Sequence, residues 1–402
     1  MSERRVIPLR PQRPTAPATP QLSAPPPLSL YIHFPWCVRK CPYCDFNSHA
    51  VHQDGIPEAA YVDALIADLE AALPDVWGRR VLSIFIGGGT PSLISAEGLD
   101  RLLTAVRMLL PLDPMAEITL EANPGTVEAE RFAGYRAAGV NRLSLGIQSF
   151  EDRYLRALGR IHAGAEAHKA AELALTHFES VNFDLMYALP GQSMAHLAAD
   201  LRTAIALSPQ HLSCYHLTLE PNTPFHHNPP ARLPDGDVAA DMQQMVETLL
   251  ADAGYQHYET SAFAQPGKRC RHNLNYWTFG DYLGIGAGAH SKLSSHTGIV
   301  RQMRHKHPGA YLAAHGHGDF VQTEQGLSVA DLPFEFMMNG LRLIDGIPAD
   351  LMEARTGIAL DVIEAKVIAA RDRGLLEVAG DTLRPTLQGQ RFLNDLLEMF
   401  LD

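Results

Sequence analysis

Six short apolar runs between residues 28 and 221 are separated by longer segments of helical periodicity. We expect the apolar runs to be strands at 28–34, 81–86, 117–121, 142–147, 182–187 and 211–217. We expect helices between them at about 57–73, 96–110, 127–138, 151–177 and 194–207. Parallel strands need long crossover connections, so this alternation predicts an α/β fold with a parallel sheet. Six such units predict a partial, open (β/α)6 barrel with its functional side chains at the carboxyl ends of the strands.

The rest of the chain divides into three further segments. Residues 1–27 hold eight of the 28 prolines and lack the apolar core of a secretory signal, so we expect a disordered Pro-rich tail. Their arginines also fit a transit peptide, but the prolines oppose its amphipathic helix. With the barrel at 28–220, residues 221–326 are expected to form a connector. Helical patterns and a short hairpin predict a winged-helix-like α+β domain over 327–402.

Composition narrows the partners that we expect. The 33 basic and 45 acidic residues give a net charge of −12, which argues against nucleic-acid binding and favours a packing or lid role for the C-terminal domain. Five cysteines, three of them in one motif, fit a reducing, cytoplasmic location rather than a disulfide framework. No apolar run approaches the length of a transmembrane segment. The sequence leaves open peripheral membrane contact and homodimer formation.

Three cysteines directly follow the first predicted strand. Cys37, Cys41 and Cys44 have the spacing C-x3-C-x2-C. Three thiolates can bind three irons of a [4Fe–4S] cluster and leave the fourth iron for a small molecule. The alternative is a zinc site completed by His33 or His49, because zinc prefers four nitrogen or sulfur ligands.

Polar residues follow several of the other predicted strands. The second strand leads into the glycines of residues 87–90, where the main chain can approach a ligand closely. Glu121 and Asp184 can accept hydrogen bonds from ribose hydroxyls or an ammonium group, and Gln148 can both donate and accept. Arg160 can pair with a carboxylate through two hydrogen bonds. Because these strands end at one mouth, the pattern favours a ligand site over unrelated surface loops.

Together these motifs resemble the coproporphyrinogen-dehydrogenase-like family of radical S-adenosylmethionine proteins. The resemblance covers about residues 28–400 and is carried by 31–37, the cysteine loop, 87–91, 121–124, 143–150, 184–190 and the C-terminal domain. It implies that Cys37, Cys41 and Cys44 hold a [4Fe–4S] cluster whose open iron is chelated by S-adenosylmethionine. The family's S-adenosylmethionine contacts map onto Tyr31, Gly88, Gly89, Thr90, Glu121, Gln148, Arg160 and Asp184.

Two features favour one branch of that family. The oxidase branch has a further cysteine two residues after the third ligand, where this chain has Phe46. The run at 272–277 reads H-N-x-x-Y-W and resembles the HemW branch, which is associated with binding haem and delivering it to haemoproteins. This implies haem and an apo-haemoprotein acceptor as partners. The residues expected near haem are His272, Asn273, Tyr276 and Trp277, with His290 and Cys270 as further candidates.

The resemblance leaves one enzymatic alternative open. It is an oxygen-independent coproporphyrinogen III oxidase, which would decarboxylate its substrate to protoporphyrinogen IX by radical chemistry. Whether S-adenosylmethionine is cleaved is not decided by the sequence, and no catalytic residue is assigned. The family expectation is therefore a haem chaperone on a radical S-adenosylmethionine barrel.

Overall fold

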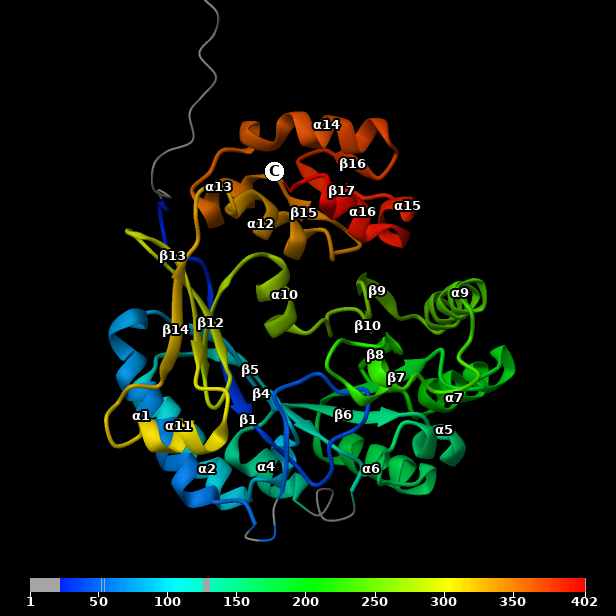
Figure 1. Cartoon of the computed structure of the whole chain (residues 1–402), viewed down its shortest axis with the longest axis horizontal. Helices are drawn as coiled ribbons and strands as arrows, with labels where there is room; N and C mark the ends of the chain where they lie inside the picture. The colour runs from blue at the N-terminus through cyan, green and yellow to red at the C-terminus, as the bar shows by residue number, and fades with distance from the viewer. Residues whose placement is uncertain (1–21, 52, 54, 126–130, 402) are drawn as a thin grey trace, which may run out of the picture.

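The core of the protein is one twisted sheet of twelve strands with a smaller domain at one end (Figure 1). The computed structural model describes residues 22–51, 53, 55–125 and 131–401. Most of the expected N-terminal tail and the start of the expected helix at 127–138 lie outside these residues. The strand order is β14-β13-β12-β11-β1-β4-β5-β6-β7-β8-β10-β9.

The six predicted barrel strands are present and lie next to one another in chain order. They are β1 (Leu28–Phe34), β4 (Val81–Gly88), β5 (Leu112–Ala122), β6 (Arg142–Gln148), β7 (Ser180–Tyr187) and β8 (His211–His216). Each pairs in parallel with the next. Most side chains of β1 and β6 are buried on both faces, as expected for strands covered by crossover helices. The predicted α/β fold with a partial parallel barrel is confirmed.

Helices connect these strands and cover the outer face of the sheet (Figure 1). They are α1 (Glu58–Val76), α2 (Ala96–Leu109), α4 (Phe132–Ala138), α5 (Asp152–Ala157), α6 (Gly164–His177) and α7 (Met194–Leu207). In α2, for example, Leu99, Leu102, Leu103 and Val106 form the buried stripe, and the Ser95 hydroxyl caps the first turn by accepting from Gly98 N.

The single helix predicted over 151–177 is wrong, because the chain leaves helical geometry between α5 and α6. Gly159 has a φ of +71°, and a Cβ there would lie 2.8 Å from Cδ of Pro42 in the cysteine loop. The break therefore lets the segment at 158–163 pack closely against that loop. Helical periodicity continues across the break in the sequence and conceals it.

Residues 221–326 contribute strands to both edges of the sheet, which the sequence did not predict. The strands are β9 (Gln256–Glu259), β10 (Ala262–Ala264), β11 (Asp281–Ile285), β12 (His290–Ser295), β13 (Gly298–Arg304) and β14 (Val321–Gly326). β11 pairs in parallel with β1, and β12–β14 follow it in antiparallel order. The helices here are α8 (Pro224–His227), α9 (Gly236–Asp252), α10 (Arg271–Trp277) and α11 (Pro308–Ala314). The division of the chain at residues 220 and 326 stays a prediction.

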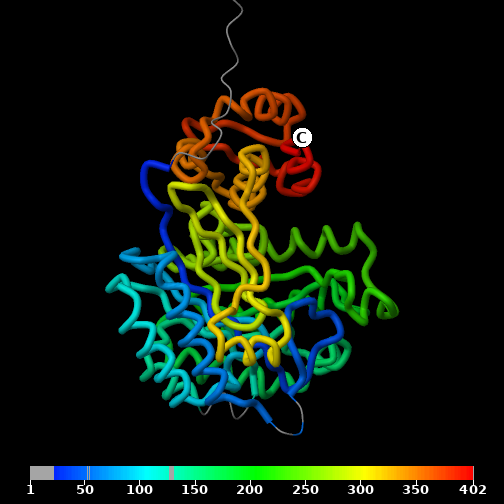
Figure 2. Tube along the Cα trace, turned by 60° about the vertical axis from the view of Figure 1, so that its left-hand side comes forward, coloured from blue at the N-terminus to red at the C-terminus, as the bar shows by residue number. Residues whose placement is uncertain are grey.

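The C-terminal domain has its own apolar core and a three-stranded sheet. Its elements are α12 (Leu332–Gly340), β15 (Ile347–Pro348), α13 (Asp350–Thr356), η2 (Leu360–Ile363), α14 (Glu364–Asp372), β16 (Leu376–Ala379), β17 (Thr382–Pro385), α15 (Leu387–Arg391) and α16 (Leu393–Glu398). Figure 2 shows this domain stacked on the β12–β14 end of the large sheet. Phe279 and Ile299 of the preceding segment belong to its core, so the two parts share apolar packing. No described helix is long and apolar enough to cross a membrane.

Candidate functional site

The cysteine loop leaves β1 and is closed at its base. Two short strands, β2 (Trp36–Cys37) and β3 (His49–Ala50), pair in parallel and bring the ends of the loop together. Cys37, Cys41 and Cys44 are half-buried free thiols. Burial raises the pKa of Cys37 and Cys44, and the Ser48 hydroxyl acts in the opposite direction on both. For Cys37 and Cys44 the loss of hydration outweighs the hydroxyl groups, so their pKa values lie above the usual range.

The three thiols open into a cavity of about 450 Å³ at the carboxyl ends of the barrel strands. We call this space the cluster cavity. Its walls include the three cysteines together with Gly88, Gly89, Thr90, Glu121, Gln148, Arg160 and Asp184. Seven of the eight residues expected to contact S-adenosylmethionine therefore lie around one cavity, and its volume is in the range of small-molecule sites.

Two carboxyl groups of the cluster cavity are removed from bulk water, which disfavours their ionised forms. Removal from bulk water raises the pKa of Glu121 to about 8, and the neighbouring Asp184 adds to the shift. The same desolvation raises the pKa of Asp184, which hydrogen bonds from Asn182 (2.8 Å) and Ser144 (3.2 Å) oppose. Two desolvated carboxyl groups in one cavity are stabilised by a cationic ligand. The sulfonium and ammonium groups of S-adenosylmethionine meet that requirement.

Arg160 connects the cavity wall to the cysteine loop. Its guanidinium donates to the Gly146 carbonyl (2.9 Å) and the Asn123 side chain, and lies 3.6 Å from the Cys41 sulfur. A fixed cation at this distance can offset the negative charge of a thiolate-bound cluster. Gln148 lies at the end of β6 with a φ of +66°, a costly conformation for a non-glycine residue that is common at functional sites.

The glycines at the end of β4 are required by packing within the protein. Gly88 has a φ of +117°, and a Cβ there would lie 2.6 Å from the His33 ring. A Cβ on Gly89 would lie 2.5 Å from the Trp36 carbonyl oxygen. The turn therefore fits tightly against the residues around the end of β1, and Gly88 N donates to Glu121 (3.1 Å). Its contribution to the site is to hold the main chain and Glu121 in place.

A second cavity of about 370 Å³ adjoins the first. We call it the aromatic cavity. Its lining residues are Tyr31, His33, Phe46, Asn47, Phe85, Gly88, Glu121, Tyr276, Tyr282, Gly288 and His290. Phe46, Gly88 and Glu121 line both cavities. Tyr31, the eighth residue expected to contact S-adenosylmethionine, lies on the aromatic side of this shared wall.

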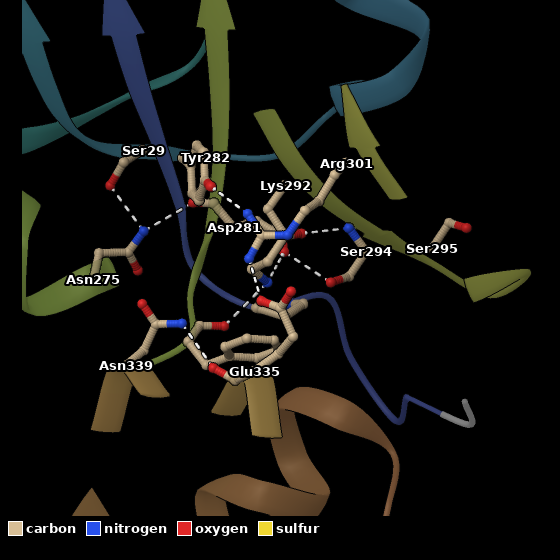
Figure 3. Close-up of polar contacts among 12 residues, drawn as sticks. Ser29, Asn275, Asp281, Tyr282, Lys292, Ser294, Ser295, Arg301, Glu335 and Asn339 are labelled. Atoms are coloured by element: carbon tan, nitrogen blue, oxygen red, sulfur yellow. Dashed lines mark hydrogen bonds and ion pairs between the residues drawn. The ribbon is translucent and has the colours of Figure 1, made fainter. Parts of the chain in front are cut away.

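Helix α10, which carries the H-N-x-x-Y-W run, is anchored behind the aromatic cavity. The His272 imidazole is 1% exposed, lies 3.0 Å from the Ser83 hydroxyl through Nδ1, and packs on Phe85. Asn275 donates to the Ser29 hydroxyl (2.9 Å) and the Asp281 carbonyl (2.8 Å), as Figure 3 shows. Sequence reasoning missed Asn275, which gave no pattern beyond its place in the run. These contacts place Tyr276 on the cavity wall.

Of the other residues expected near haem, His290 lines the aromatic cavity, and Asn273, Trp277 and Cys270 line neither cavity. Trp277 packs under the guanidinium of Arg342, 4.5 Å from its ring centre. Asn273 is partly exposed, and Cys270 is fully buried with its thiol 3.4 Å from Glu117. The Glu117 carboxylate also accepts from His272 N (3.1 Å), so it stabilises the start of α10.

The donor set of the cysteine loop suits a cluster. Within the described ranges, no three His, Cys, Asp or Glu side chains converge on a point that could hold a single metal ion. In a cubane cluster each thiolate binds a different iron, so this geometry does not require the sulfurs to converge. The three thiols lie around the cluster cavity with Arg160 beside them.

Comparison with known proteins places this architecture in a family. The Radical SAM superfamily matches residues 31–204, and the HemN C-terminal domain matches residues 327–392. The protein named Heme chaperone HemW from Escherichia coli (strain K12) is 50% identical over 94% of this chain and 98% of its own length. The chain belongs to the HemW family. HemW relatives from Haemophilus influenzae (50% identical) and Bacillus subtilis (33%) also align over more than nine-tenths of both chains.

A solved structure supports the fold of this HemW family member. It is described as "Coproporphyrinogen III oxidase (HemN) from Escherichia coli is a Radical SAM enzyme". It superposes with a TM-score of 0.79 at 24% identity, covering 94% of this chain and 90% of that one. At this identity the likeness shows a common fold and leaves the activity open.

Proposed function

We propose that this chain is a haem chaperone that holds a [4Fe–4S] cluster, binds S-adenosylmethionine, and delivers haem to apo-haemoproteins. The observation that carries the proposal is the shared wall between a cavity with three thiols and a cavity lined by aromatic rings and histidines. Relatives named as haem chaperones, 50% identical over 94% of the chain, support it. The oxidase reading is supported by likeness of fold alone.

Each cofactor has a set of residues that suits it. Cys37, Cys41 and Cys44 would bind three irons, and the bound cluster would supply an open iron for chelation of S-adenosylmethionine. Arg160, 3.6 Å from the Cys41 sulfur, would offset the negative charge of the cluster, and Glu121 with Asp184 favours the cationic ligand. Gly88, Gly89, Thr90 and Gln148 complete the wall of the cluster cavity. Tyr31 would contact S-adenosylmethionine from the aromatic cavity, on the other side of Glu121.

Cysteine variants test the cluster. Cys37→Ser, Cys41→Ser or Cys44→Ser should each lose most of the iron and visible absorbance gained on anaerobic reconstitution with iron and sulfide. Cys214→Ser is the matched control, because this buried free cysteine lies outside both cavities. Equal iron content in all four variants would reject the assignment. If the protein instead bound zinc and retained it as firmly as the iron expected here, the zinc alternative would be favoured.

Haem would bind beside the H-N-x-x-Y-W segment, in the aromatic cavity to which Tyr276 contributes. His272 would support haem binding indirectly, through its ring contacts with Phe85 and Tyr276. The proposed acceptor is an apo-haemoprotein, and the proposed location is cytoplasmic, with which five free cysteines agree. The C-terminal domain is proposed to pack over this region without reading nucleic acid.

The decisive pair of assays is a haem titration and a coproporphyrinogen assay on the same reconstituted protein. We expect saturable binding of haem and no protoporphyrinogen IX with reductant and S-adenosylmethionine under anaerobic conditions. Robust decarboxylation without saturable haem binding would show that the protein is the oxidase and not the chaperone.

A further inference from the structure

The aromatic cavity contains several atoms that could bind haem iron, and most are already engaged. His33 lies 2.9 Å from the Tyr31 hydroxyl through Nδ1 and 2.8 Å from the Asn47 carbonyl through Nε2. Glu121 accepts from Gly88 N. Neither side chain can turn toward a ligand without losing these contacts.

The tyrosines of the cavity are poor iron ligands in this setting. Burial raises the pKa of Tyr31, Tyr276 and Tyr282, so each stays a neutral phenol near pH 7. Tyrosine binds haem iron as a phenolate, which these environments disfavour. In addition, the Tyr282 hydroxyl accepts from Arg301 (3.0 Å), as Figure 3 shows.

His290 differs from these residues because both its ring nitrogens are available. It begins β12 at the rim of the cavity, is exposed, and makes no side-chain hydrogen bond with any described residue. Partial burial lowers the pKa of His290, and the nearby charges of Lys306 and Arg301 lower it further. A neutral imidazole with a free lone pair is the form that binds iron.

His272 lacks that freedom. It lies behind the cavity wall, with Phe85 at 5.1 Å and Tyr276 at 4.9 Å between ring centroids. Its Nε2 has no hydrogen-bond partner in the described structure, but the ring is 1% exposed and lines neither cavity. An iron atom could reach this imidazole only if the wall opened.

The cavity also offers surfaces for the rest of a porphyrin. Tyr31 and Phe85, on the adjacent strands β1 and β4, stack with centroids 6.4 Å apart and 23° between their planes. Such faces pack favourably on a flat conjugated ring. Near His290, the exposed Lys306 amine makes no hydrogen bond with a described residue and can pair with a carboxylate.

We propose that His290 is the axial ligand of haem held in the aromatic cavity, with Lys306 pairing with a haem propionate. This assignment rests on the proposed function, because it names the ligand of the cargo that the chaperone would carry. It places the iron near the start of β12, in a cavity whose Glu121 and Gly88 also line the cluster cavity.

The test is a haem titration of anaerobically reconstituted protein, followed by the Soret band and electron paramagnetic resonance. His290→Ala should lose the histidine-ligated spectrum and weaken haem binding at least about tenfold, and added imidazole should restore the spectrum. His296→Ala, in the turn of the same β12–β13 hairpin, is the matched control and should match the wild type. His272→Ala should retain the histidine-ligated spectrum.

Other variants keep the proposal falsifiable if His290→Ala folds poorly. His290→Met should bind haem with a thioether-type spectrum and unchanged cluster content. Lys306→Glu should weaken haem binding several-fold, whereas Lys169→Glu, the same charge change on exposed α6, should not. A wild-type spectrum and affinity in both His290 variants would overturn the assignment while leaving the chaperone intact. Absence of saturable haem binding by the wild-type protein would reject the proposed function itself, and the ligand assignment with it.

Discussion

Glu121 stands in the wall between the two cavities, and its ionisation is the residue-level property that is most easily measured. Its pKa is raised to about 8 by desolvation and by Asp184. Below that pH the carboxyl group holds a proton, which a cationic ligand must displace to gain a full ion pair. Binding of S-adenosylmethionine is therefore coupled to release of a proton.

From this coupling we predict that affinity for S-adenosylmethionine rises with pH up to about 8 and then levels off. The rise should approach roughly tenfold per pH unit where Glu121 is mostly protonated. Calorimetry in two buffers of different ionisation enthalpy measures the released proton directly. Glu121→Gln should bind more weakly and with a much shallower pH dependence.

The control for this prediction is Glu220→Gln, which changes another carboxylate that lines the cluster cavity. It should keep the slope of the wild-type protein. If Glu121→Gln also kept that slope, the proton would have to come from another group, and the electrostatic account of the cavity would be wrong.

At the scale of one element, α10 shows how a short motif can divide into anchoring and exposed positions. The helix has seven residues, too few to be stable alone, so its contacts with the sheet must hold it. Asn275 makes two buried hydrogen bonds to Ser29 and Asp281, and Asn273 is partly exposed.

We therefore predict different costs for the same substitution at two neighbouring positions. Asn275→Ala should lower the free energy of unfolding by about 1–3 kcal/mol, because it leaves a buried hydroxyl and a carbonyl without their donor. Asn273→Ala should change it by less than about 0.5 kcal/mol. Urea denaturation of both variants gives the comparison. Equal losses would show that α10 is not anchored through Asn275.

The elements that the sequence predicted well are those with a local pattern. The run at 28–34 is a continuous apolar stretch, and the structure has β1 at the same residues. The cysteine spacing is likewise local, and all three thiols meet at one cavity. The glycine turn and the carboxylates follow their strands directly, so the parallel topology alone brings them together.

The features that were missed depend on contacts between distant parts of the chain. β11 pairs in parallel with β1, more than 240 residues earlier in the chain, and nothing in its five residues encodes that partner. The break at Gly159 depends on Pro42 of the cysteine loop. The separation of Tyr31 from the cluster cavity follows from the position of Glu121 between two spaces, which no spacing in the sequence reveals.

At the scale of the whole molecule, one polar chain connects the C-terminal domain with the aromatic cavity. Glu335 of α12 forms an ion pair with Arg301 of β13, which donates to the hydroxyl of the cavity residue Tyr282 (Figure 3). A separate ion pair, between Arg391 of α15 and Glu247 of α9 (2.6 Å), joins the same domain to the segment at 221–326 through residues that do not line this cavity.

These two contacts predict different effects on haem. Glu335→Gln leaves the Arg301 charge uncompensated beside the cavity, so it should strengthen binding of anionic haem by roughly two- to fivefold, an effect that salt reduces. Glu247→Gln should cost similar stability with no change in haem affinity. Titrations at low and high salt measure both. A shift of equal size in the two variants would exclude a specific link through Arg301.

Delivery of haem is the property that separates a chaperone from a protein that merely binds haem. For a direct measurement, the reconstituted protein is loaded with haem and either mixed with an apo-haemoprotein or separated from that apo-haemoprotein by a dialysis membrane. The appearance of the holo-haemoprotein is then followed over time. Our account predicts transfer that is much faster on direct contact than across the membrane. Equal rates in the two arrangements, or no transfer in either, would contradict it.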